Sequence, residues 1–201
     1  AQQHEFANRM HVMSGLLEVG RIDEAMGYAT AIDSATAGLA AELDAAIDDP
    51  RLVALLVAKT TVARERGVVL DVDCETPVHI APAMSDPLVT VVGNLVENGI
   101  DAASTVRPVD GVPSVVVRFA RGDGELVIDV DDTGPGIPAE IAGSIFVEGW
   151  STKAGNGRQR GLGLALVRQV LHTLGGDVVL RGGGGARFRV TIPLSQAVPS
   201  P

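Results

Sequence analysis

Residues 126–136 of this chain have the sequence LVIDVDDTGPG, in which a short apolar run ends in Asp-Thr-Gly-Pro-Gly. The Val- and Ile-rich run predicts a strand from Leu126 to Asp131. Asp132 then lies at the strand end, where its carboxylate can accept a hydrogen bond from an exocyclic amine such as adenine N6. Gly134 and Gly136 let the backbone turn sharply and approach a flat ligand. Taken alone, the motif is equally compatible with a plain turn.

A pair of asparagines precedes this motif, in residues 94–98 (NLVEN) of a predicted long amphipathic helix. Asn94 and Asn98 are four residues apart, so both amides lie on one face of the helix. An Asn carbonyl is a neutral oxygen ligand that suits Mg²⁺, which usually takes few protein ligands in addition to phosphates and water. Two solvent-facing amides on an ordinary helix are the alternative interpretation.

A third motif follows, in residues 160–164 (RGLGL), which open another predicted helix. Glycine backbone and the N–H groups of a helix N-terminus together can cradle phosphate. The stretch is not a Walker A motif, because no Gly-Lys-Ser/Thr follows a strand at the required spacing, and it lacks the βαβ context of a dinucleotide fingerprint.

The regions around these motifs predict a mixed α and β domain. Asp49 is placed to cap a helix that has Pro50 in its first turn. Predicted helices span residues 52–65, 86–103 and 162–174, and predicted strands span residues 68–72, 114–119, 126–131, 178–181 and 188–192. The turn signal at residues 121–124 and the glycine run at 182–185 predict two hairpins between neighbouring strands. We expect this domain to cover residues 49–195, with a disordered tail at 196–201.

Residues 1–48 have a different, purely helical pattern. Apolar residues recur at heptad-like spacing from Phe6 to Leu17, the pattern breaks at Gly20, and it resumes at Ile22. This predicts a helical hairpin with a very short turn. Two such helices cannot bury an apolar stripe alone, so we expect two copies of the chain to form a four-helix bundle.

Composition excludes some classes of function. The net charge of −9 argues against sequence-independent nucleic-acid binding, which needs a basic surface. The longest apolar run, about residues 52–58, is far too short to cross a bilayer. The chain starts at Ala, and we expect it to be a piece of a longer protein. Its single cysteine, Cys74, lies in an alternating apolar stretch and is interpreted as a structural thiol.

The asparagine pair, the D-x-G-x-G and the G-x-G occur in the order of the N, G1 and G2 boxes of the GHKL ATPase superfamily, which the chain therefore resembles. Residues 145–153 look like the F box and ATP lid of that superfamily. The resemblance implies an α+β fold in which helices cover one face of a mixed sheet. It also implies ATP and Mg²⁺ as cofactors, with Asp132 at the adenine amine and Asn98 at the metal. The residues that it assigns to nucleotide binding are Asn94, Asn98, Asp132, Gly134, Gly136, Lys153, Arg160, Gly161, Leu162, Gly163 and Leu164.

Residues 4–8 (HEFAN) resemble the H box of sensor histidine kinases. Neutral imidazole is a competent nucleophile near pH 7. His4 would therefore accept the phosphoryl group, Glu5 would take its proton and Asn8 would position a water for dephosphorylating a partner. Arg9 stands where most such kinases have Pro, and the fuller string resembles the citrate and C4-dicarboxylate sensor kinases.

That resemblance implies a homodimer, a response regulator as partner, and a membrane-anchored sensor region outside this sequence, which would make this the cytoplasmic portion. Hydrolytic members of the superfamily carry Glu where this chain has Asn94, and an amide cannot act as a base. Three alternatives remain: an ATP-inactive phosphotransferase of the sporulation type, an anti-sigma serine kinase, and a chaperone or topoisomerase domain.

Overall fold

The computed structural model describes residues 14–15, 18–22, 24, 26, 34–106, 111–147, 163–182 and 184–194. Its contacts divide the chain into two compact units, Ala1–Glu42 and Leu43–Pro201. The predicted boundary lay six residues later, between residues 48 and 49. Among the described helices, none is both long enough and apolar enough to span a bilayer.

In the first unit, the described residues include a turn at Val19 and Gly20. The Val19 N–H donates to Gly15 O at 3.2 Å, and Gly20 has a φ of +73°. A left-handed glycine of this kind commonly ends a helix. It lies where the sequence predicts the turn of the hairpin; the predicted helix before it is mostly outside the described residues.

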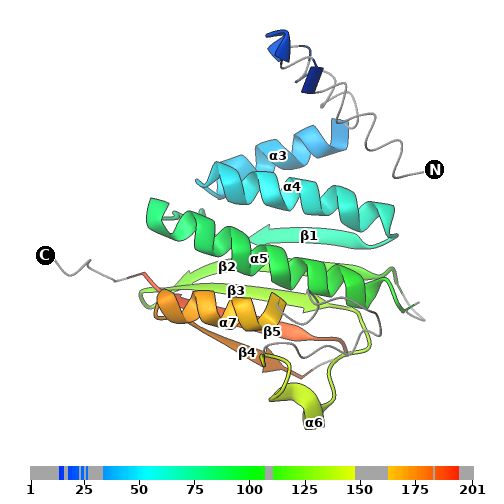
Figure 1. Ribbon diagram of the computed structural model, residues 1–201, viewed down its shortest axis with the longest axis vertical. Coiled ribbons are helices and arrows are strands. Elements are labelled where there is room, and N and C mark those ends of the chain that lie inside the picture. The colour runs from blue at the N-terminus through cyan, green and yellow to red at the C-terminus, as the bar shows by residue number, and fades with distance from the viewer. Residues whose placement is uncertain are drawn as a thin grey trace, which may run out of the picture. The chain divides into compact units, whose positions relative to one another are not determined.

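The second unit combines helices with one five-stranded sheet (Figure 1). The described elements of the chain are α3 (Ser34–Ala46), α4 (Pro50–Glu65), β1 (Val69–Cys74), α5 (Pro82–Ala103), β2 (Ser114–Gly122), β3 (Glu125–Asp132), α6 (Ala139–Ala142), α7 (Gly163–Thr173), β4 (Asp177–Arg181) and β5 (Arg187–Pro193).

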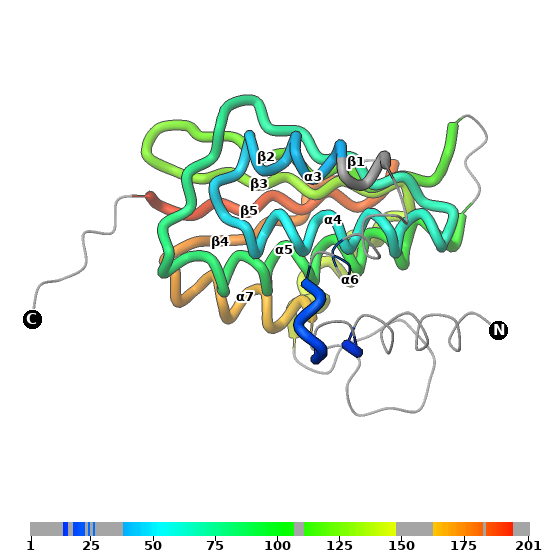
Figure 2. The backbone as a smooth tube through the Cα atoms, turned by 90° about the horizontal axis from the view of Figure 1, so that it is seen from above, coloured from blue at the N-terminus to red at the C-terminus, as the bar shows by residue number. Residues whose placement is uncertain are grey.

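The sheet has the strand order β1-β2-β3-β5-β4. β1 pairs with β2 in parallel and the other three pairs are antiparallel, so the sheet is mixed. Helices α4, α5 and α7 lie side by side on one face, with α5 in the middle (Figure 2). The predicted α+β fold, a mixed sheet covered by helices on one face, is confirmed for this unit.

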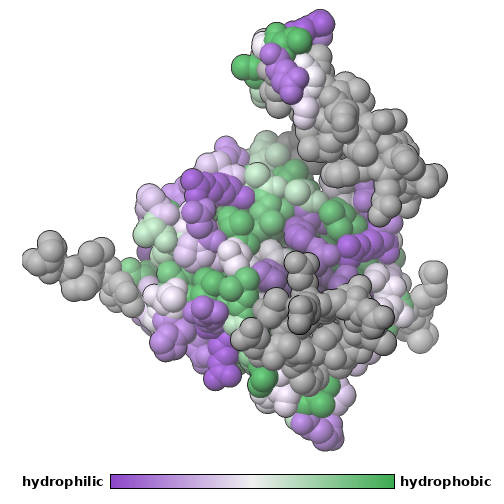
Figure 3. Space-filling view, viewed as in Figure 1, coloured by the Kyte–Doolittle hydropathy of each residue, from purple (hydrophilic) through white to green (hydrophobic). Residues whose placement is uncertain are grey.

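Alternating side chains explain why the helices bind this face. Along β2 and β3 every second residue is buried, among them Val117, Phe119, Ile128 and Val130. The residues between them, such as Asp129, point to the opposite face. α5 supplies the facing layer, with Leu88, Val91, Val92, Leu95, Val96 and Ile100 fully buried. On the helix side, hydrophilic and hydrophobic residues are interspersed over the exposed surface (Figure 3).

The hairpin between β2 and β3 has a two-residue turn made of Asp123 and Gly124. Their φ angles are 41° and 83°. Positive φ at both central positions is the type I′ turn that an Asp-Gly pair favours. This turn sets the register that pairs Gly122 with Glu125 and, at the far end, Val115 with Asp132.

Helix α5 begins at Pro82, four residues before the predicted start. Pro82 occupies the first turn, where its fixed φ suits a helix and its missing N–H costs nothing. Pro87 stands inside the helix, and for that reason the sequence pattern pointed to a later start. The short helix α6 and the bridge between Ile47 and Val78 were not predicted from sequence.

Helix α4 begins as predicted, with Asp49 as its N-cap. The Asp49 carboxylate accepts hydrogen bonds from Arg51 N and Leu52 N at 2.9 and 3.0 Å, and Pro50 follows at the first position. Burial tends to raise the pKa of Asp49, but hydrogen bonds from Ser85 and these two backbone groups lower it below the usual value.

Replacing Asp49 by Ala should lower the free energy of unfolding at neutral pH by about 1–2 kcal/mol, the usual cost of losing an N-cap. Because the folded-state pKa is lowered, the contribution is complete above the ordinary value of 3.8 and is lost as the pH falls through the folded pKa. The difference in unfolding free energy between the unmodified chain and Asp49→Ala should therefore disappear at acidic pH. Urea unfolding of the unmodified chain and of Asp49→Ala at several pH values measures this difference.

The control is Asp44→Ala, at an exposed position of α3. It should change the free energy of unfolding by less than about 0.5 kcal/mol.

Candidate nucleotide site

The site is organised by α5, whose buried face packs on the sheet and leaves one polar stripe beside it. The half-buried residues of this stripe are Asn94, Glu97, Asn98 and Asp101. They follow the i, i+3, i+4 spacing of one helix face. The asparagine pair is therefore fixed by the same amphipathic pattern that builds the core.

The first residue of α7 lies directly against the two asparagines. A Cβ atom added at Gly163 would be 2.9 Å from Asn94 Oδ1 and 3.9 Å from Asn98 Nδ2. Asn94 Nδ2 donates to the carbonyl of Thr90 at 2.8 Å, which leaves its Oδ1 directed toward Gly163. The structure thus brings together two of the predicted motifs, which are about 65 residues apart in the sequence.

The motif of residues 132–136 meets the same helix through Gly99 and Ala102. A Cβ atom added at Gly99 would lie 3.5 Å from Asp132 Cβ, and Gly99 directly follows Asn98. A Cβ at Gly134 would be 2.7 Å from Ala102 Cβ. The approach at Gly134 leaves no room for a Cβ atom, and the two contacts together bring the end of β3 against the last turns of α5.

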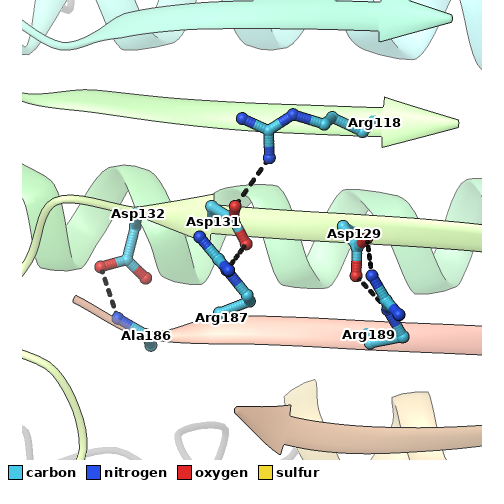
Figure 4. Close-up of polar contacts among 7 residues, drawn as sticks. All are labelled: Arg118, Asp129, Asp131, Asp132, Ala186, Arg187 and Arg189. Carbon is cyan, nitrogen blue, oxygen red and sulfur yellow. Dashed lines mark hydrogen bonds and ion pairs between the residues drawn. The ribbon is translucent and has the colours of Figure 1, made fainter. Parts of the chain in front are cut away.

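The Asp132 carboxylate is held by two backbone N–H groups. Gly134 N donates to its Oδ1 at 2.7 Å. Ala186 N donates to the same oxygen at 3.3 Å, the contact drawn in Figure 4. Oδ2 accepts no hydrogen bond from the part of the chain that the structure describes, so it is the free acceptor of this group. Burial raises the pKa of Asp132, the two N–H donors oppose that effect, and the neighbouring Asp131 carboxylate adds to it.

Asp131 points to the other face of the sheet, where it forms ion pairs with Arg118 and Arg187 at 2.7 and 2.8 Å. Two residues earlier, Asp129 binds Arg189 through two hydrogen bonds of 2.7 and 2.6 Å (Figure 4). These pairs hold β2, β3 and β5 in register across their solvent-facing side. The alternation of side chains then directs Asp132 inward, toward α5.

A pocket of about 480 Å³ lies where the ends of β2, β3 and β5 meet. It includes Asp132 and Gly185, but its walls also include Val116, Asp131 and Arg187, which belong to the charged face. The asparagine pair does not line it. We therefore locate the nucleotide site by the convergence of the three motifs on α5, on the helix side of the sheet.

Gly185 and Ala186 belong to this site but were not predicted from the sequence. The run of four glycines at 182–185 was interpreted only as a hairpin turn. A Cβ atom at Gly185 would lie 1.8 Å from the Asp132 carbonyl oxygen. Asp132 N donates to Ala186 O at 3.0 Å, and Ala186 N donates to the Asp132 carboxylate. The glycine run was the available signal: it permits this contact between segments far apart in sequence.

Replacing Gly185 by Ala should therefore displace the β5 hairpin from Asp132 and lower the free energy of unfolding by about 1–3 kcal/mol, the usual cost of overpacking. Nucleotide affinity should fall as well. Gly184→Ala is the matched control, because a Cβ there meets nothing within 4 Å. Equal stability of the two variants in urea unfolding would contradict a close approach of Gly185 to the Asp132 carbonyl.

Glu97 is the one carboxylate within the asparagine motif, and it points toward α4. Lys59 Nζ pairs with its Oε2, and Arg66 pairs with its Oε1 at 3.0 Å. Arg66 also pairs with Asp101. Glu97 is thus engaged by two cations from the neighbouring helix.

Several predicted site residues lie outside the described residues: His4, Glu5, Asn8, Lys153, Arg160, Gly161 and Leu162. Asn94, Asn98, Asp132, Gly134, Gly136, Gly163 and Leu164 are described. Gly136 has a φ of +75°, a conformation that glycine adopts without strain. Leu164 is half-buried in the first turn of α7.

Residues 83–196, more than half of the chain, match the family described as histidine kinase-, DNA gyrase B- and HSP90-like ATPases. The chain belongs to this family. Sensor protein CitS of Halalkalibacterium halodurans is 36% identical over 203 residues, which cover 98% of this chain and 37% of that protein. Sensor histidine kinase DcuS of Escherichia coli K12 is 32% identical and covers 96% of this chain and 35% of its own length. The chain therefore spans about a third of these relatives.

Solved structures share the fold of this chain. Full-length ShkA in complex with AMPPNP superposes with a TM-score of 0.60 at 24% identity, covering 71% of this chain and 29% of that one. The mycobacterial sensor histidine kinase MprB has a TM-score of 0.54 at 25% identity. The match covers 69% of this chain and 91% of the MprB chain. The predicted resemblance to the catalytic core of citrate and C4-dicarboxylate sensor kinases is confirmed by these relatives.

Proposed function

We propose that this chain is the kinase core of a two-component sensor, which binds ATP and transfers its γ-phosphoryl group to His4. The observation that carries this proposal is the contact of Gly163 with Asn94 and Asn98. The next residue of α5, Gly99, contacts Asp132. A phosphate-binding helix N-terminus, an amide pair and an adenine-directed carboxylate thereby share one end of α5.

The amide at Asn94 supports a protein acceptor in place of water. Hydrolytic members of the family have a carboxylate at this position, which can deprotonate a water molecule, whereas an amide cannot. The carboxylate three residues later, Glu97, is engaged by Lys59 and Arg66. The site therefore suits holding ATP until an imidazole reaches the γ-phosphorus.

In the transfer step, a ring nitrogen of His4 forms a bond to the γ-phosphorus while the bond from that phosphorus to the β,γ-bridging oxygen breaks. ADP leaves with the bridging oxygen. Glu5 takes the proton from the other ring nitrogen. The N–H groups at the start of α7, with Lys153, Arg160, Gly161 and Leu162, stabilise the negative charge of the phosphates.

The residues present fit a magnesium ion bound together with the nucleotide. Among the described residues, no group of three or more His, Cys, Asp or Glu side chains could hold a metal unaided. Asn98 would supply one amide oxygen and the phosphates of ATP the others, which is the mixed ligand set that Mg²⁺ favours. The ion would neutralise phosphate charge.

We further infer that residues 1–48 dimerise as a helical hairpin and that residues 49–195 form the ATP-binding domain. Val19 and Ile22 of the first unit are 69% and 58% exposed, and burial against a second copy would remove them from water. Relatives of this chain are named as a sensor protein and a sensor histidine kinase. On that likeness we propose a response regulator aspartate as the next acceptor and a membrane-anchored sensor upstream. Asn8 would position water for the reverse, phosphatase reaction.

Incubating the chain with γ-labelled ATP and Mg²⁺ tests the proposal. We expect protein-bound label that is lost in acid and retained in base, as a phosphorus–nitrogen bond requires. Nucleotide binding without any label would favour the ATP-binding fold without kinase activity. A chain that binds no nucleotide would support the ATP-inactive phosphotransferase instead.

A further inference from the structure

Four charged residues join α4 to α5 beside the asparagine pair, and we call them the α4–α5 clamp: Lys59, Arg66, Glu97 and Asp101. Lys59 lies in α4, and Arg66, the C-cap of that helix, follows seven residues, or two turns, later. Their partners are one turn apart on α5. The clamp is partly shielded from solvent, since the Lys59 side chain is 19% exposed and that of Glu97 is 35% exposed.

The clamp separates two neighbouring side chains of one helix. Asn94 and Glu97 are i, i+3 neighbours, a spacing that puts their Cβ atoms roughly 5–6 Å apart. Asn94 Oδ1 faces Gly163 at the start of α7. Glu97 extends the other way, with one carboxylate oxygen paired to Lys59 and the other to Arg66. Figure 1 shows α5 between α4 and α7. The amide that faces α7 and the carboxylate that pairs with the α4 side are therefore directed to opposite neighbours.

A released Glu97 would be a carboxylate next to the position where hydrolytic relatives carry their base. Its side chain is one methylene longer than that of Asn94 and could reach a water in front of the γ-phosphate. We propose that Lys59 and Arg66 decide the phosphoryl acceptor: they keep Glu97 from activating water, so that ATP is preserved for the histidine. This inference rests on the proposed function, and it makes the two cations positioning residues that act through Glu97.

The suppressed reaction is ordinary hydrolysis. A water oxygen would form the new bond to the γ-phosphorus, and the bond from that phosphorus to the β,γ-bridging oxygen would break. ADP would leave with the bridging oxygen, and the water proton would pass to Glu97. With both carboxylate oxygens bound to cations, this proton has no free acceptor in the asparagine motif.

The test measures phosphate release from Mg-ATP by the full 201-residue chain carrying His4→Gln, so that turnover of a phosphohistidine cannot contribute. We expect Lys59→Met to raise the release rate about tenfold, less than the 10²–10⁴-fold that a well-placed base gives. Adding Glu97→Gln should return the rate to the starting value, and Lys59→Arg, which keeps a cation, should leave it low.

Arg51→Met is the matched control. Arg51 also pairs an α4 cation with an α5 carboxylate, Asp86, but near the start of both helices and away from the asparagines. Its loss should not change phosphate release. Nucleotide affinity and thermal unfolding of each variant establish that the domain is folded.

Three results would overturn the inference. One is unchanged or lower phosphate release by a folded, nucleotide-binding Lys59→Met variant. A second is an increase that persists when Glu97→Gln is added, and a third is an equal increase in Arg51→Met. The proposed kinase activity is judged separately, from labelling of the chain that retains His4. A chain that labels normally while Lys59→Met fails to release phosphate would refute only the role of the clamp.

Discussion

Replacing Asp132 by Asn should weaken ATP binding by about 100-fold, since hydrogen bonds to charged groups contribute about 1.5–3 kcal/mol and each 1.4 kcal/mol is a factor of ten. The Asn carbonyl can still accept from Gly134 N and Ala186 N, so the local fold is retained. What is lost is the negative acceptor at Oδ2, where we expect the adenine amine to bind. Fluorescence or calorimetric titration with a non-hydrolysable ATP analogue measures the affinity.

The matched control is Asp131→Asn, which removes the same charge from the next residue but on the opposite face of the sheet. Its nucleotide affinity should stay within a few-fold of the unmodified chain. Equal loss in both variants would mean that net charge, and no specific contact, controls binding.

The pH dependence of ATP binding should report the same carboxylate. Burial raises the pKa of Asp132 in the free protein. Because a proton on Oδ2 would remove the acceptor at which we expect the amine to bind, ATP affinity should be complete above this raised pKa and fall as the pH falls through it. The decline should begin at a higher pH than an ordinary Asp would give. The sign for stability is opposite: folding favours the protonated group, so its contribution is lost as pH rises through the folded pKa.

Replacing His4 by Gln should abolish phosphoryl transfer to the protein, because no other group in the H box can form a phosphorus–nitrogen bond. The expected loss of label is complete within the detection limit. Nucleotide affinity should not change, since the ATP-binding residues belong to the other unit of the chain. The assay is label incorporation from γ-labelled ATP, with affinity measured in parallel.

His11→Gln is the control for this prediction, because it changes an imidazole two turns away on the same predicted helix. It should incorporate label at nearly the normal rate. Retained label in His4→Gln would assign the phosphoryl group to another residue, and stable label on a hydroxyl would favour the serine kinase alternative.

Local patterns predicted most of the sheet and helices because each is determined by nearby residues. The Asp-Gly turn of residues 123–124 and the Asp49 cap depend only on neighbouring backbone, and both occur as predicted. Helix α5 was recognised by its apolar periodicity. Its start was misplaced because Pro87, normally a helix breaker, lies within the second turn.

The sequence could not predict contacts that depend on how distant segments pack. Gly185 meets the Asp132 carbonyl only because β5 pairs with β3, and no local pattern in the glycine run specifies that partner. The pairing of Lys59 with Glu97 likewise depends on the packing of α4 beside α5. The three motif clusters were identified from residue types alone, while their convergence on one end of α5 is a tertiary property.

The most direct test of the central claim is to locate the phosphoryl group after incubation with Mg-ATP, by mass spectrometry of peptides kept at alkaline pH. We expect phosphate on His4, with His11, His79 and His172 unmodified. Phosphate on one of those other histidines, or on a serine or threonine, would contradict it.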